Sequence, residues 1–250
     1  MYCRYFDVTQ REIEPAVESF VFPDYAVHCC SRDNAKYMSV TEDLNDSAVE
    51  YVSVVDRRHK HPKFFLSLCL SPMYGNERKW LLLAELVEHN KLEGVEYFYL
   101  YVKDMDDYTN KDCLQRSRGH SKYVIFQDLD ERILPTDNTT VRELVRETMD
   151  TNKTIAMVSF PSLEFMMTLS PPLEYRVLVM WVHAVSIFFP GYKELHFTPE
   201  EVVMRHYNSV ALQGNPDLTL LNDTAFPAEL MSTLYRKVEE TLNHVYGSAN

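Results

Sequence analysis

The stretch that decides the fold is KYVIFQDLDERILP, residues 122–135. The apolar run at 123–126 predicts a short strand that is buried on both faces. It leads into three carboxylates, Asp128, Asp130 and Glu131. Ligands of open α/β sheets bind beyond the carboxyl ends of the strands, so we expect these acids to lie where a ligand binds.

The spacing of Asp128 and Asp130 allows both side chains to reach one ligand, because residues i and i+2 of an extended backbone point to the same side. Hard divalent cations such as Mg²⁺ and Mn²⁺ prefer oxygen ligands and commonly bind together with phosphates of a substrate. A solvated strand end without a metal is the alternative. A second Asp-x-Asp, formed by Asp104 and Asp106, also follows an apolar run, and spacing alone does not separate the two.

Length and composition predict a globular chain with one medium-sized domain, alone or with a small appendage. The 250 residues are 46% hydrophobic, and their net charge of −12 argues against a nucleic-acid partner, because phosphate binding needs a basic surface. No apolar run approaches the ~20 residues of a membrane helix, and residues 1–10 lack the apolar segment of a signal peptide. We therefore expect the chain as given to be soluble.

The five cysteines show no C-x-x-C spacing, which disfavours a zinc site. A disulfide from Cys3 to either Cys29 or Cys30 would hold the N-terminal region together, and Cys69 with Cys113 is a second candidate pair. The odd number leaves one thiol free unless it pairs between chains.

Four Asn-x-Ser/Thr sequons begin at Asn45, Asn138, Asn152 and Asn222. Chance alone gives roughly one or two such matches in a chain of this length. The sequons favour a protein of the secretory lumen, and a cytosolic protein with unused sequons is the alternative.

We expect two regions, residues 1–62 and residues 63–250. The first contains short β-like segments separated by acidic and turn-forming residues, which predicts a small β-rich layer. It closes with the basic run 57–63, which we interpret as a solvated linker, and contact with a diphosphate is the alternative.

The second region begins with a strand–helix–strand unit. A strand at 64–70 precedes a helix at 77–91 with Asn76 as its N-cap, and Gly94 ends this helix before a strand at 97–102. Such a unit joins parallel strands through a right-handed crossover. It predicts an α/β fold with a Rossmann-type, mainly parallel sheet and flanking helices.

Further elements follow the acidic stretch. Thr140 and Glu143 form a capping box before a helix at 141–149. We also predict strands at 154–160, 175–181 and 202–207, and an amphipathic helix at 228–246.

Several pieces of sequence, spread over nearly the whole chain, form a specific combination. They are MYCRYFD at 1–7, HCC at 28–30, SPMYGNE at 71–77, WL at 80–81, residues 85–91 with Gly94, RSRG at 116–119, SKYV at 121–124, DLDER at 128–132, HAVS at 183–186, FPGY at 189–192 and RHY at 205–207. In this combination the chain resembles the glycosyltransferase family 92 proteins. The resemblance implies a GT-A-like fold and a nucleotide-sugar transferase of the secretory pathway, at the Golgi membrane or in its lumen. Family members are usually tethered by an N-terminal membrane helix, which this sequence does not contain.

The resemblance also implies a reaction and a site. Similar members use Mn²⁺ and transfer galactose from UDP-galactose to a glycan acceptor with inversion. Asp128 and Asp130 then look like the DxD pair that holds the metal and, through it, the diphosphate of the UDP-sugar, in preference to the pair at 104 and 106.

Four further residues are candidates for this site. His206 and His183 lie on family-like pieces, and either is a candidate to complete the metal ligands, since imidazole suits Mn²⁺. Glu131 and Glu164 are the candidate bases for the acceptor hydroxyl.

The chain departs from the family between Thr109 and Lys111, where family members carry a few dozen more residues. A short helix at about 111–118 would span the shortened link. We expect one sheet strand and part of the substrate pocket to be missing. The alternative function is therefore a catalytically impaired family member. A phosphohydrolase or nuclease is a further alternative, which the acidic net charge and the lack of a further carboxylate cluster disfavour.

Overall fold

The computed structural model describes residues 1–21, 27–55, 61–73, 75, 78–101, 113–114, 116–160, 165–169, 177–180, 185–188, 190–206 and 227–247. The chain divides into two compact units, Met1–Arg57 and Arg58–Asn250. Each unit has a sheet of its own.

The first unit is built on a four-stranded antiparallel sheet with the order β2-β1-β3-β4. Its strands are β1 (Tyr2–Phe6), β2 (Val17–Glu18), β3 (Tyr37–Thr41) and β4 (Val52–Ser53). A disulfide joins Cys3 of β1 to Cys29, while Cys30 is a free and exposed thiol, which resolves the two alternatives for Cys3. The hydroxyl of Tyr5 donates to the carbonyl of Cys30 at 2.6 Å. The small β-rich layer that we predicted is therefore present.

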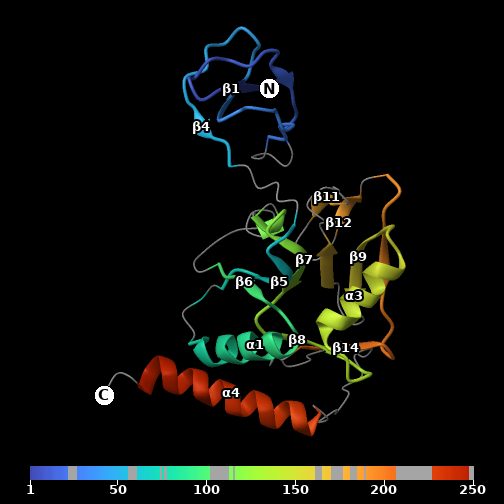
Figure 1. The fold of residues 1–250 in the computed structure, drawn as a ribbon. Coiled ribbons are helices and arrows are strands. Elements are labelled where there is room, and N and C mark those ends of the chain that lie inside the picture. Colours follow the sequence, from blue (N-terminus) through green and yellow to red (C-terminus); the bar gives the residue numbers. More distant parts are fainter. Residues whose placement is uncertain are drawn as a thin grey trace, which may run out of the picture. The chain divides into compact units, whose positions relative to one another are not determined.

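The second unit centres on a six-stranded sheet with the order β13-β9-β10-β7-β5-β6 among the described residues (Figure 1). Its strands are β5 (Phe64–Leu70), β6 (Tyr97–Tyr99), β7 (Ser121–Gln127), β9 (Ile155–Phe160), β10 (Phe165–Leu169) and β13 (Lys193–His196). β5 pairs in parallel with β6 and β7, and β13 pairs in parallel with β9. Only β10 is antiparallel to its neighbours β7 and β9 within this sheet. The sheet is mixed, with parallel pairing on both sides of the antiparallel β10, so the α/β class is confirmed and the Rossmann-type arrangement stays a prediction.

The sheet supplies much of the hydrophobic core of this unit. Leu66 and Leu68 of β5 are fully buried, and the adjacent residues Val124 and Ile125 bury both faces of β7, as predicted from its continuous apolar run. Burying side chains of this size contributes roughly 1.5–3 kcal/mol each relative to leaving them exposed.

The described helices of this unit include α1 (Trp80–Leu92), α3 (Val141–Thr151) and α4 (Ala228–Tyr246), and α4 packs on α1. Both halves of the predicted capping box at α3 are present. Gly94 has a φ of +87° after the end of α1, a conformation that glycine adopts without strain, so it stops the helix as predicted.

The beginning of α1 differs from the prediction. Its N-cap is Lys79, so the assignment of Asn76 as the cap is wrong, and Asn76 itself lies outside the described residues. The helix also buries Glu88 and His89. Glu88 is buried where α4 runs beside α1 (Figure 1), and the hydroxyl of Thr241 donates to its carboxylate at 2.9 Å. His89 is buried on the side of α1 that faces β8.

In the described part of the second unit, four strands were not predicted: β8 (Glu131–Pro135), β10, β12 (Val185–Phe188) and β13. β8 pairs antiparallel with β14 (Val202–His206), and β12 pairs antiparallel with β11 (Val177–Met180). The acidic residues that precede β8 conceal it in the sequence, because a charged turn and the short apolar run of β8 read together as a loop.

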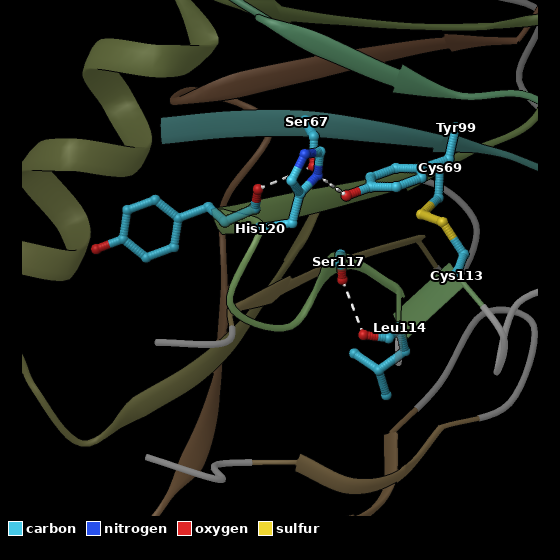
Figure 2. Close-up of a disulfide and its surroundings, with 8 residues drawn as sticks. Ser67, Cys69, Tyr99, Cys113, Leu114, Ser117 and His120 are labelled. Carbon is cyan, nitrogen blue, oxygen red and sulfur yellow. Dashed lines mark hydrogen bonds between the residues drawn. A yellow bond between two sulfur atoms is a disulfide. The ribbon is translucent and has the colours of Figure 1, made fainter. Parts of the chain in front are cut away.

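The predicted disulfide between Cys69 and Cys113 is present, with a Cα–Cα distance of 6.3 Å (Figure 2). It ties β5 to helical backbone at 113–114 and 116–117, where the hydroxyl of Ser117 donates to the carbonyl of Leu114 at 2.9 Å. The helix predicted at about 111–118 agrees with this described part. None of the described helices combines the length and the apolarity that crossing a membrane requires.

Candidate functional site

The acidic stretch forms a tight turn at the carboxyl end of β7. β7 ends at Gln127, and β8 begins at Glu131, so the turn consists of three residues, Asp128, Leu129 and Asp130. Because β5 and β7 are parallel neighbours, their carboxyl ends lie at the same edge of the sheet. The acids are therefore at the edge where open α/β sheets bind ligands, as predicted.

Three carboxylates converge at this turn. Asp128, Asp130 and Glu131 each present an oxygen atom, and these atoms all lie within 4.8 Å of one another. The two aspartates are half-buried and Glu131 is buried. This donor set fits a hard divalent cation, because Mg²⁺ and similar ions take several carboxylate oxygens at about 2.0–2.6 Å.

The environment of Glu131 opposes a negative charge. Burial raises the pKa of its carboxyl to about 8, and the nearby charges of Asp128 and Asp130 add to the rise. The backbone N–H of Asp128 donates to the Glu131 carboxylate at 2.9 Å, which acts in the opposite direction. A cation among the three groups would favour the ionised form, so the electrostatics of the turn suit a bound metal.

A buried arginine holds the turn against α1. Arg132 has no exposed surface and pairs with Glu85 of α1, at 2.9 Å between Nη2 and Oε2 and 3.3 Å between Nε and Oε1. The same guanidinium donates to the carbonyl of Leu129 at 2.9 Å and to the carbonyl of Leu82 at 3.3 Å. One side chain thus connects the middle residue of the acidic turn to two consecutive turns of the helix.

Two further side chains secure β8 behind the turn. The amide nitrogen of Gln127 donates to the carbonyl of Glu131 at 2.6 Å, and Nε2 of His89 lies 3.2 Å from the carbonyl of Ile133. Burial, assisted by the charge of Arg132, lowers the pKa of His89 to about 4, so this histidine is neutral at physiological pH. Its role is to hold β8 in place behind the acidic turn.

The backbone also brings one of the predicted histidines to this position. In the antiparallel pairing of β8 with β14, His206 is the partner of Glu131. His183, Glu164 and the second Asp-x-Asp at 104 and 106 lie outside the described residues.

Sequence reasoning missed Arg132, Glu85 and Gln127. Arg132 and Glu85 lie in the family-like pieces 128–132 and 85–91, but no role was assigned to either, and nothing local pairs Arg132 with a residue 47 positions away.

Comparison with known proteins gives this geometry a context. The sequence profile of glycosyltransferase family 92 matches residues 65–111 and 109–176, a region that contains β5, α1, β7 and the acidic turn. Over this stretch, which is less than half of the chain, the sequence is similar to glycosyltransferase family 92. The family 92 profile thus covers the carboxyl edge of the sheet and both partners of the Arg132–Glu85 pair.

The chain is also similar to a curated relative, the Beta-1,4-galactosyltransferase galt-1 of Caenorhabditis elegans. The two are 27% identical over 107 residues, which cover 28% of this chain and 25% of the relative. The chain thus matches about a quarter of the length of that relative. The two stretches of the family match meet at residues 109–111, where the sequence departs from the family pattern.

Proposed function

We propose that this chain is a metal-dependent glycosyltransferase that moves a sugar, galactose, from a UDP-sugar to a glycan acceptor with inversion, on a GT-A-like fold. The observation that carries the proposal is the convergence of three carboxylates at the carboxyl end of a central parallel strand, in a stretch that matches the family 92 profile. The name of the C. elegans relative supports galactose as the sugar.

In this proposal Asp128 and Asp130 hold Mn²⁺ or Mg²⁺. A bound cation would supply Lewis-acid stabilisation of the charge that develops on the departing nucleoside diphosphate. Arg132 fixes the carbonyl of Leu129 and so holds the two aspartates in one arrangement. His206 remains a candidate ligand, supported by its register opposite Glu131. His183 remains a second candidate, on sequence alone.

The acceptor hydroxyl must lose a proton during transfer, and the candidate bases are Glu131 and Glu164. Glu131 is buried and its carboxylate accepts the N–H of Asp128, so its position suits the support of the turn. Glu164 then becomes the preferred candidate for the base, and comparing the variants E131Q and E164Q tests this choice. We expect E164Q to lose turnover and to keep Mn²⁺-dependent UDP binding. We do not expect this combination in E131Q.

The experiment that tests the function is release of UDP from UDP-galactose by the purified chain with and without Mn²⁺. The D128N/D130N variant should lose both Mn²⁺-dependent UDP binding in calorimetry and turnover. The control is E147Q/D150N, which removes two exposed carboxylates from α3 and changes the net charge equally. Unchanged Mn²⁺-dependent UDP binding in D128N/D130N would contradict the assignment of Asp128 and Asp130 as metal ligands.

A second candidate function is a family member that binds UDP and transfers nothing. The interruption of the family match at residues 109–111 favours it, since a missing segment can remove part of a substrate pocket. Binding of UDP and Mn²⁺ without release of UDP from UDP-galactose, in the presence of glycan acceptors, would support this candidate over the active enzyme.

We place the protein in the secretory pathway, at the Golgi membrane or in its lumen. The two disulfides support this location, because disulfides form and persist in oxidising compartments.

A further inference from the structure

The loop between β8 and α3 carries the sequon Asn138-Thr139-Thr140 on the surface. Asn138 is exposed and has a φ of +61°, in the left-handed region that asparagine tolerates better than most residues. The loop is well organised around it, because the hydroxyl and the backbone N–H of Thr139 both donate to the Asp137 carboxylate, at 2.6 and 3.1 Å. The asparagine side chain therefore projects from a defined turn into solvent.

The two disulfides are evidence for the cellular compartment of the protein that is independent of the sequon. Each of the two units contains one, and both Cys69 and Cys113 are about 1% exposed, so this bond is an internal part of the fold. A chain that acquires such bonds during folding passes through an oxidising compartment. Asn-linked glycans are attached to surface Asn-x-Ser/Thr sites of secreted proteins.

We propose that Asn138 carries an N-linked glycan. The bond that forms joins Nδ2 of Asn138 to the anomeric carbon of an oligosaccharide, whose donor is a lipid-linked oligosaccharide diphosphate of the secretory pathway. The bond between that carbon and the diphosphate breaks, the lipid diphosphate leaves with the electron pair, and the amide proton passes to a base of the transferring enzyme. No oxidation or reduction takes place.

The fold accommodates this modification without loss of a contact. The third residue of the sequon, Thr140, is the N-cap of α3, and its hydroxyl receives the N–H of Glu143 at 3.2 Å. A glycan on Nδ2 of Asn138 leaves this cap unchanged. The loop follows the far end of β8, whose five residues span about 13 Å from Glu131 to Pro135, so the glycan lies away from the acidic turn.

The half-buried Asn152, at the other end of α3, provides a contrast. Its Oδ1 accepts the N–H and the hydroxyl of Thr154 at 2.9 and 2.7 Å, and its side chain lines a cavity of about 510 Å³ together with Leu195 and Glu200. Asn138 has the more open position of the two sequons beside α3, and the proposal concerns this position.

The test uses the full chain directed into the secretory pathway of a eukaryotic cell line. We expect peptide:N-glycosidase treatment in ¹⁸O-water to convert Asn138 into heavy-oxygen aspartate in the corresponding peptide. N138Q should migrate faster in electrophoresis, by the difference that one glycan makes. T140S should retain the glycan, since serine preserves both the sequon and the N-cap. The N152Q variant is the control for an Asn-to-Gln change beside α3, and its Asn138 peptide should still be converted.

An unmodified Asn138 in secreted protein whose two disulfides are formed would overturn the proposal. The peptide measurement on the unsubstituted chain decides this even if N138Q folds poorly. The result is also independent of the proposed transferase activity, because modification at Asn138 requires no turnover by this chain.

Discussion

Arg132 and Glu85 form a two-point ion pair that joins β8 to α1 beside the acidic turn. The guanidinium is fully buried, whereas the Glu85 side chain is 26% exposed. A buried charge of this kind is expensive to leave without its partner, which makes the pair a sensitive point of both the fold and the site.

We expect E85Q to destabilise the protein by about 3–5 kcal/mol, because it leaves the Arg132 charge buried without its carboxylate partner. The measurement is urea denaturation followed by fluorescence. The matched control is R236M, which removes the Arg236–Glu240 pair on the exposed face of α4, and an exposed pair of this kind is worth only about 0.3–0.5 kcal/mol. Equal effects of the two variants would contradict the structural role of Arg132.

If the acidic turn binds a metal, Mn²⁺ should change the stability of the folded chain. With Mn²⁺ at about 100 times its dissociation constant, ligand linkage should stabilise the native chain by ~2.7 kcal/mol, and D128N/D130N should lose this gain. Without metal, the same variant should be as stable as the native chain or more stable, since it removes two charges that oppose ionisation of Glu131. Thermal melts with and without Mn²⁺ measure both effects. A melting temperature that Mn²⁺ raises equally in both proteins would show that the cation binds elsewhere.

Glu93 predicts a pH dependence of stability. Burial raises the pKa of its carboxyl from 4.5 to about 7 in the folded protein, although the N–H of Val141 donates to it at 2.9 Å. The folded state thus holds the proton more tightly than the unfolded state, so this contribution to stability is present below pH 4.5 and is lost as the pH rises to 7.

The variant E93Q removes this dependence and keeps an acceptor for Val141. We expect E93Q to match the native stability near pH 4 and to exceed it by up to ~3 kcal/mol at pH 8. Urea denaturation across this pH range is the measurement, and E147Q on the exposed face of α3 is the control. A constant difference between E93Q and the native chain at all pH values would contradict the raised pKa.

Gly75 and Gly94 allow the cost of a left-handed backbone to be measured separately from the cost of a steric clash. Gly94 and Gly75 have nearly the same φ, +87° and +86°, but a Cβ at Gly94 would lie 2.7 Å from Cβ of Arg142, whereas a Cβ at Gly75 would meet nothing within 4 Å. We expect G75A to cost about 1–2 kcal/mol from the left-handed backbone alone, and G94A to cost more. Denaturation of the two variants side by side measures the difference, and equal costs would place the Arg142 contact in doubt.

Local patterns predicted the parts of the fold that depend on neighbouring residues. Strand β5 and helix α4 have the predicted bounds, and the capping box of α3 forms as its Thr140 and Glu143 imply. The predicted start of α1 was wrong: the helix begins at Trp80, after an N-cap at Lys79 that makes no side-chain cap hydrogen bond, so a favourable cap residue did not decide where the helix starts.

The sequence by itself determined that two aspartates follow a buried strand, because a continuous apolar run and the two-residue period of extended backbone are local properties. Only the tertiary structure decided what surrounds them. It paired β8 with β14, so that His206 faces Glu131 in the register, and it buried Arg132 against Glu85 from a helix 47 residues away. Burial and charge pairing depend on which segments meet in space, and the pattern of a single segment does not encode its partner.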